Sequence, residues 1–98
     1  MDRLTLVLDL DETLVHCSTK TTSHNSQEVI ISYERIPSIT EQVKCYVYKR
    51  PFLDEFLEKM DILYDITIFT SSIKGYADPV IDYIDPRKII KKRYYREV

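Results

Sequence analysis

The sequence predicts a single α/β domain built on an open parallel β-sheet. Residues 3–9, 65–70 and 89–95 have the apolar or β-branched composition of strands. Residues 51–60 and about 76–83 repeat their apolar side chains at helical spacing, so strands and helices alternate along much of the chain. A chain of 98 residues with 44% apolar residues supports one small core and excludes a two-domain organisation.

The first predicted strand spans residues 3–9. Its apolar run, LTLVL, ends at the acidic sequence DLDE of residues 9–12. Short apolar runs without polar alternation are typical of strands buried on both faces. We therefore expect a central strand whose end presents Asp9 and Asp11 at an edge of the sheet.

An antiparallel hairpin is predicted as an insertion at about residues 28–49. Residues 29–33 and 43–48 are β-branched and aromatic, and Pro37 lies in the turn between them. The preceding residues 17–27 are almost wholly polar and predict a loop.

Two helices and two further strands follow the hairpin. Pro51 suits the first turn of a helix, where no N–H donor is needed, and the predicted apolar stripe comprises Phe52, Leu53, Phe56, Leu57 and Met60. The strand at 65–70 leads into the hydroxyl residues Thr70, Ser71 and Ser72. Asp85 and Pro86 end the second helix, and a basic strand follows.

Ligands bind open parallel sheets beyond the carboxyl ends of the strands. If the first two strands are neighbours, Asp9 and Asp11 share this rim with Thr70. The hydroxyl residues after the strand are helix-capping types, and a helix start offers unpaired N–H groups to anions. The rim is therefore the predicted site.

Asp9 and Asp11 are separated by one residue, so extended backbone would place their carboxylates close together. Either one keeps its proton and acts as a general acid, or a divalent cation lies between them. Both arrangements suit phosphoryl transfer, in which one carboxylate attacks phosphorus and the other protonates the leaving oxygen. Oxygen ligands alone favour Mg²⁺.

Charge is distributed unevenly, with −7 over residues 1–85 and +5 over residues 86–98. We interpret the basic end as one wall of an anion pocket rather than a nucleic-acid surface. No apolar run approaches the ~20 residues that cross a bilayer, and no signal or transit peptide is recognisable, so we expect an intracellular, nuclear or cytoplasmic chain. Cys17 and Cys45 have no metal-binding spacing and are interpreted as buried small hydrophobic residues or idle thiols.

Asp9-x-Asp11-x-Thr13 after an apolar strand resembles the first motif of the haloacid-dehalogenase-like (HAD-like) phosphatases. More narrowly, the sequence resembles the small C-terminal-domain and Dullard-type phosphatases, the FCP-homology or NLI-interacting-factor-like group, at residues 9–16, 49–51, 69–72, 76–80 and 95–97. The resemblance implies an incomplete three-layer, Rossmann-like (HAD-like) sheet with a hairpin insertion. Residues 1–98 then form the N-terminal portion of one domain.

The resemblance also implies a Mg²⁺-dependent protein serine/threonine phosphatase with an aspartyl-phosphate intermediate. Its substrate would be the RNA polymerase II C-terminal tail or a related regulatory phosphoprotein. Asp9 matches the nucleophile and metal ligand, and Asp11 matches the general acid/base, with its backbone carbonyl on the metal. The substrate and phosphate contacts fall at Thr70, Ser71, Tyr76 and Arg96.

Other interpretations stay open. Thr70 could cap a helix, and Tyr76 could be a core residue. The chain could be a noncatalytic phosphopeptide-binding or interaction module, or a mitochondrial import subunit of the same fold. The family's lysine motif and its metal-completing strand would lie beyond Val98. We therefore expect weak activity, an unpaired strand at 3–9 and self-association through that edge.

Overall fold

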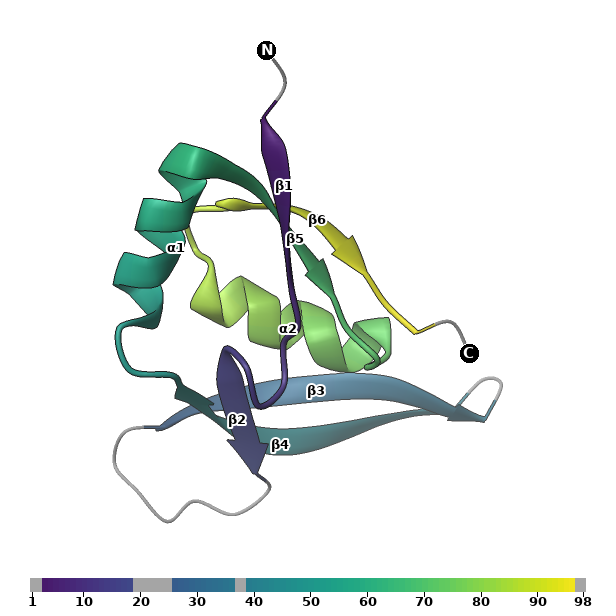
Figure 1. Cartoon of the computed structure of the whole chain (residues 1–98). Coiled ribbons are helices and arrows are strands. Elements are labelled where there is room, and N and C mark those ends of the chain that lie inside the picture. Colours follow the sequence, from purple (N-terminus) through teal and green to yellow (C-terminus); the bar gives the residue numbers. More distant parts are fainter. Residues whose placement is uncertain (1–2, 19–25, 37–38, 97–98) are drawn as a thin grey trace.

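The structure, a computed structural model, describes residues 3–18, 26–36 and 39–96. It is an α/β fold, as predicted (Figure 1). The strands and helices, in chain order, are β1 (Leu4–Leu8), β2 (Val15–Ser18), β3 (Ser26–Ile36), β4 (Ile39–Lys49), α1 (Leu53–Leu63), β5 (Tyr64–Phe69), α2 (Lys74–Ile84) and β6 (Ile90–Tyr94). In the part of the chain that is described, no helix is long and apolar enough to cross a membrane.

The parallel sheet has the strand order β1-β5-β6 and includes all three strands predicted for it. Among the described residues, β1 is an edge strand of this sheet and β5 is the central one, so the expected unpaired edge at residues 3–9 is present. The expectation that β1 is buried on both faces is wrong, because Leu4 and Val7 are 73% and 58% exposed. An apolar run alone does not reveal whether neighbours cover both faces of a strand.

The predicted hairpin is confirmed and extends over β3 and β4. A strand that the sequence analysis missed, β2, pairs antiparallel with β4, so that the second sheet has the order β2-β4-β3. Cys17 and Ser18 therefore lie in β2, and Ser26 and Gln27 lie in β3, and not in the predicted loop. Residues 19–25 of that loop and the turn at Pro37 fall outside the described residues.

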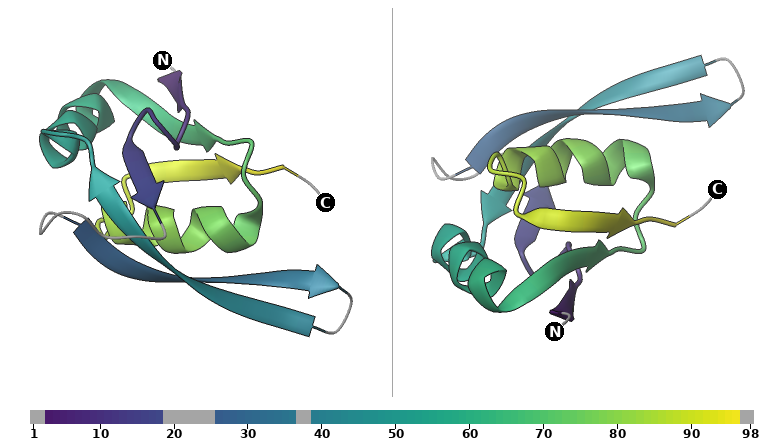
Figure 2. Two further views of the ribbon diagram at one scale, coloured as in Figure 1. Left: turned by 90° about the horizontal axis from the view of Figure 1, so that it is seen from below. Right: turned by 90° about the horizontal axis from the view of Figure 1, so that it is seen from above.

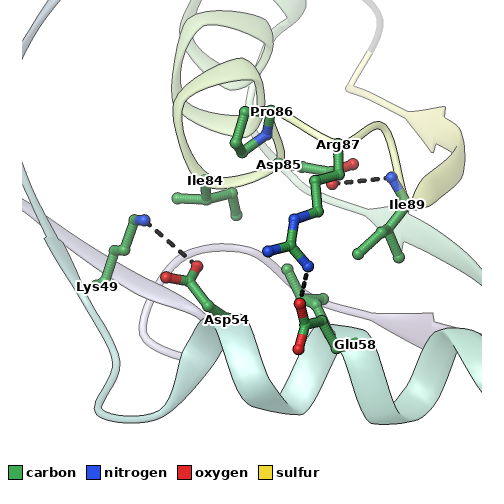
Figure 3. A pocket seen from close by; sticks show the side chains of 9 residues that line it. Lys49, Asp54, Glu58, Ile84, Asp85, Pro86, Arg87 and Ile89 are labelled. Atoms are coloured by element: carbon green, nitrogen blue, oxygen red, sulfur yellow. Dashed lines mark hydrogen bonds and ion pairs between the residues drawn. The ribbon is translucent and has the colours of Figure 1, made fainter.

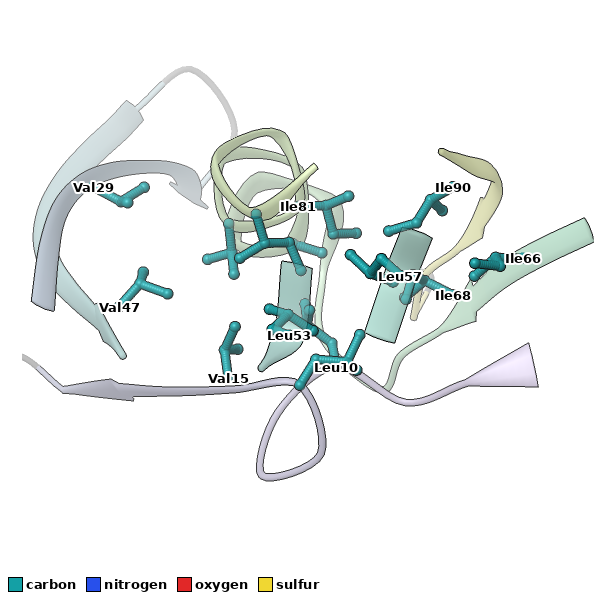
Figure 4. Close-up of a cluster of buried hydrophobic side chains, with 14 of the residues drawn as sticks. Leu10, Val15, Val29, Val47, Leu53, Leu57, Ile66, Ile68, Ile81 and Ile90 are labelled. Atoms are coloured by element: carbon teal, nitrogen blue, oxygen red, sulfur yellow. The ribbon is translucent and has the colours of Figure 1, made fainter. Parts of the chain in front are cut away.

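Helix α2 lies between the two sheets, as two further views show (Figure 2). Its buried residues are Ala77, Val80, Ile81 and Ile84. They share one core with Val29 and Val47 of the hairpin and with Ile66 and Ile68 of β5 (Figure 4). Burial of each large aliphatic side chain contributes roughly 1.5–3 kcal/mol, so this core fixes the position of α2 and of the residues before it.

Helix α1 begins two residues later than predicted, at Leu53. Pro51 belongs to the preceding turn, and Phe52 has a φ of 64°, which is a left-handed conformation. The buried apolar stripe of α1 is therefore narrower than the predicted one. Leu53 and Leu57 are buried, whereas Phe52 and Phe56 are 79% and 37% exposed.

The end of α2 at Ile84 confirms the predicted stop at Asp85 and Pro86. The buried Asp85 carboxylate accepts hydrogen bonds from the backbone N–H groups of Ile89 and Ile90, at 2.9 and 2.8 Å, and so directs the chain into β6. A hollow beside this turn is spanned by ion pairs between Lys49 and Asp54 and between Arg87 and Glu58 (Figure 3). It lies at the opposite end of α2 from Lys74 and from the predicted site.

Candidate active site

The loop that follows β1 is anchored by two leucines. Leu10 and Leu14 are fully buried, and the Leu14 N–H donates to the Leu10 carbonyl at 2.9 Å. Between them, Glu12 turns the chain sharply with a φ of 62°. This anchoring leaves Asp9 exposed at the strand end and Asp11 partly buried.

Arg50 clamps the same loop from the hairpin side. Its backbone N–H donates to the Leu14 carbonyl at 3.0 Å, and its Nη1 donates to the Thr13 carbonyl at 3.2 Å. Within the loop, His16 Nδ1 lies 2.7 Å from a carboxylate oxygen of Glu12. The acidic loop is therefore fixed by both the core and the Lys49-Arg50-Pro51 segment.

The hydroxyl segment after β5 is held by the backbone of the C-terminal strand. The N–H of the buried Thr70 donates to the Tyr94 carbonyl at 2.9 Å, and the Arg96 N–H donates to the Ser72 carbonyl at 3.0 Å. Thr70 Oγ1 accepts from the Ser72 N–H at 3.1 Å. The N-cap of α2 is Ile73, without a side-chain cap, so the alternative that Thr70 caps this helix is wrong.

The two segments meet at Asp11. Ser72 Oγ donates to Asp11 Oδ2 at 3.0 Å, and the Tyr76 hydroxyl donates to Asp11 Oδ1 at 2.5 Å, across 61 and 65 residues of sequence. The predicted sharing of one rim by the acidic loop and the Thr70 segment is therefore confirmed. It follows from the parallel pairing of β1 with β5, in which Leu8 lies opposite Ile68.

The remaining predicted site residues lie around this contact. Asp9 Oδ1 accepts from the Leu10 N–H at 2.7 Å. Ser71 is exposed, and Arg96, also exposed, lies beside Ser72 through its backbone. Sequence reasoning did not select Ser72 as a site residue, although it belongs to the hydroxyl run that marked the strand end.

Cys17 is a second residue that the sequence analysis did not assign to the site, because it was interpreted as a buried small hydrophobic residue or an idle thiol. Burial raises its pKa to about 11, and its side chain hydrogen-bonds Tyr76. Burial and the hydrogen bond to Asp11 raise the pKa of Tyr76 well above its usual value, so the phenol keeps its proton. The site therefore extends from Asp11 through Tyr76 to strand β2.

The basic C-terminal segment contributes less to this site than predicted. Arg93 bonds Asp78 and Asp82 of α2, each at 2.8 Å, and Arg87 pairs with Glu58 of α1. These two cations are used in joining elements, and they do not form part of the expected cationic wall. Neighbouring carboxylates in the folded chain could not be inferred from the charge count.

The parallel sheet, the hairpin insertion and the acidic loop at the carboxyl end of β1 define a HAD-like domain. A family model described as NLI interacting factor-like phosphatase matches residues 4–98. The chain belongs to this family.

Curated relatives match almost the whole chain. Human carboxy-terminal domain RNA polymerase II polypeptide A small phosphatase 1 is 45% identical over 96 residues, which cover 98% of this chain and 35% of the relative. Nuclear envelope morphology protein 1 of Schizosaccharomyces pombe is 43% identical over 101 residues, covering 99% of this chain and 20% of that protein. The chain thus spans about a fifth to a third of the length of these relatives.

A solved structure of Fcp1, described as an essential RNA polymerase II CTD phosphatase, has the same fold. It superimposes with a TM-score of 0.80 at 26% sequence identity, over 96% of this chain and 30% of the Fcp1 chain. Fission yeast Fcp1 bound to beryllium fluoride matches with a TM-score of 0.78.

Proposed function

We propose that this chain carries the aspartate-dependent part of a protein serine/threonine phosphatase that forms an aspartyl-phosphate intermediate. The observation that carries the proposal is the junction of Asp11 with Ser72 and Tyr76 beside the exposed Asp9. Membership of a phosphatase family supports the same conclusion. Phosphoryl transfer needs a nucleophile and a proton donor close to the same phosphate. The two aspartates at the carboxyl end of β1 are suited to these roles.

The two carboxylates have different surroundings, which supports different roles. Asp9 is exposed and free to approach phosphorus as the nucleophile. Asp11 accepts two hydroxyl hydrogen bonds and is suited to protonate the leaving oxygen and then activate water. Thr70, Ser71 and Arg96 would contact the phosphoryl group or the substrate.

The donor set also fits Mg²⁺. This ion prefers oxygen ligands, keeps several waters and needs only one or two carboxylates from a protein. Among the residues that the structure describes, no group of three or more His, Cys, Asp or Glu side chains forms a metal cluster. The Asp9 carboxylate and the Asp11 backbone carbonyl would hold the ion, which would neutralise charge on the phosphoryl oxygens.

For the substrate, we propose the phosphorylated tail of RNA polymerase II or a related regulatory phosphoprotein. This rests on relatives whose names refer to the carboxy-terminal domain of RNA polymerase II. We propose a nuclear or cytoplasmic location on the same basis, with one relative named for nuclear envelope morphology.

Hydrolysis of p-nitrophenyl phosphate, with and without Mg²⁺, tests the proposal. We expect Mg²⁺-dependent turnover, because the ion would neutralise charge on the phosphoryl oxygens while Asp9 attacks phosphorus. The substitution Asp9→Asn should abolish this turnover, while Asp54→Asn, an exposed acid on α1, should not change it.

Turnover that survives Asp9→Asn would exclude Asp9 as the nucleophile. Metal-independent binding of a phosphopeptide without any turnover would overturn the enzymatic proposal in favour of a noncatalytic binding module.

A further inference from the structure

Two hydroxyl groups from one turn of the chain hold both oxygens of the Asp11 carboxyl. Ser72 donates to Oδ2 at 3.0 Å and Tyr76 donates to Oδ1 at 2.5 Å. Ser72 lies just before the Ile73 N-cap of α2 and Tyr76 lies in the first turn of that helix, so the junction between β5 and α2 supplies both hydroxyls. With both oxygens engaged, rotation of the carboxyl about its side-chain bonds is restricted.

We propose that Ser72 and Tyr76 are positioning residues that aim the Asp11 carboxyl at the leaving-group oxygen of a phosphoserine or phosphothreonine. The inference rests on the proposed function, in which Asp11 transfers the proton. It assigns Tyr76 to the acid/base group, whereas the family resemblance implies contact with substrate.

The segment that supplies Ser72 is itself rigid. Its backbone N–H is bound to Thr70 Oγ1, and its carbonyl is bound to the Arg96 N–H. The opposite partner, Asp11, follows a loop anchored by the buried Leu10. Proton transfer requires a catalytic group to be held within about 0.5 Å of its productive position, and independent hydrogen bonds and packing restrain both sides of this contact.

Tyr76 is held from its other side by Cys17. The phenol donates its proton to Asp11 Oδ1, and its oxygen also contacts the Cys17 side chain. The phenol ring is restrained by strand β2 as well as by its own helix.

Hydroxyl partners suit a carboxyl group that gains and loses a proton within one catalytic cycle. A lysine or arginine partner would favour only the ionised form. A serine hydroxyl can donate to the carboxylate and, after rotation, accept from the carboxylic acid. Ser72 can therefore keep its contact with Asp11 in both protonation states.

The test compares two substrates whose leaving groups differ in their need for a proton. A serine alkoxide cannot depart without protonation, whereas p-nitrophenolate can. In the full chain with Mg²⁺, Tyr76→Phe and Ser72→Ala each remove one hydroxyl. We expect each to lower kcat for a phosphoserine peptide about tenfold, with KM nearly unchanged, and to change kcat for p-nitrophenyl phosphate much less.

Tyr83→Phe is the matched control, because it removes a hydroxyl from the same helix at a ring that packs under the Lys49 ammonium group. It should change kcat for neither substrate.

In Tyr76→Phe, a rise in KM for both substrates, with kcat unchanged, would instead identify Tyr76 as a substrate contact and overturn the inference. Asp11→Asn separates the two proposals. The proposed function fails if Asp11→Asn lowers kcat equally for the two substrates. The positioning role alone fails if Asp11→Asn lowers kcat more for the phosphoserine peptide but Tyr76→Phe and Ser72→Ala do not.

A second measurement does not depend on turnover. At neutral pH, the side-chain carboxyl ¹³C resonance of Asp11 should move in Tyr76→Phe and in Ser72→Ala and stay in place in Tyr83→Phe. A resonance that is unchanged in both site variants would overturn the contact itself.

Discussion

Cys17 of β2 and Tyr76 of α2 hydrogen-bond each other, and the contact withdraws two polar groups from water. Burial is the larger cause of the raised pKa of the thiol, and the charge of nearby Asp11 adds to it. The hydrogen bond from Tyr76 acts in the opposite direction and is outweighed. Cys17 is therefore a protonated, structural thiol at neutral pH, and its place beside an acidic site favours that state.

This environment predicts slow alkylation of Cys17. At about pH 8, raising the thiol pKa from 9.0 to about 11 lowers the reactive thiolate fraction about 100-fold. The rate with iodoacetamide can be measured by mass spectrometry in a Cys45→Ala chain, with the urea-unfolded chain as the control. Equal rates in the folded and unfolded chains would contradict the buried contact.

At the scale of elements, Asp78 joins α2 to β6. Its carboxylate accepts hydrogen bonds from Arg93 at 2.8 Å and from the Tyr95 hydroxyl. Burial alone would raise the Asp78 pKa, but these hydrogen bonds outweigh it and the pKa is lowered. The same junction fixes the C-terminal strand whose backbone holds Thr70 and Ser72.

Substitution Asp78→Asn should destabilise the fold by about 1–3 kcal/mol at neutral pH, because it weakens charge-assisted hydrogen bonds. A lowered pKa in the folded state gives stability that is present above the ordinary value of 3.8 and is lost as the pH falls through the folded value. Urea unfolding should therefore show the gap between the two chains closing toward about pH 2. Asp82→Asn, whose side chain is 68% exposed, should cost less than about 1 kcal/mol.

Elements with a strong local signal were predictable from the sequence. The apolar runs of β1 and β5 and the β-branched hairpin gave correct strands, because side-chain type alone favours them. Strand β2 was missed because its sequence, VHCS, carries little strand preference and forms through pairing with β4. The start of α1 was misplaced because Arg50 fixes the chain before Phe52 takes a left-handed turn.

The site was predictable to the extent that topology determines it. Parallel neighbours bring Asp11 and Thr70 to one rim whatever their separation in sequence, so the location followed from two strand ends. The partners of Asp11 depend on side-chain geometry across 61 and 65 residues, which no local pattern records. For the same reason, the ion pair of Arg93 could not be inferred from the charge distribution.

For the whole molecule, one face of the parallel sheet carries apolar side chains that the other described residues leave exposed. On that face, Val7, Phe69 and Tyr94 line a shallow hollow and are 58%, 63% and 48% exposed. β1 forms the adjacent edge, and an edge strand presents unpaired N–H and C=O groups to other chains. We expect the 98-residue chain to self-associate by pairing this edge with the β1 strand of a second copy.

A charge placed on this edge should prevent the association. Val7→Lys adds an ammonium group to a side chain that is already exposed, so folding should be little affected while strand pairing becomes costly. Sedimentation velocity over a range of concentrations should show oligomers for the unsubstituted chain and monomers for Val7→Lys. Ile62→Lys, at a 78% exposed apolar position on α1, is the matched control and should still associate. A monodisperse monomer at all concentrations, or equal relief of association by both substitutions, would exclude β1 as the interface.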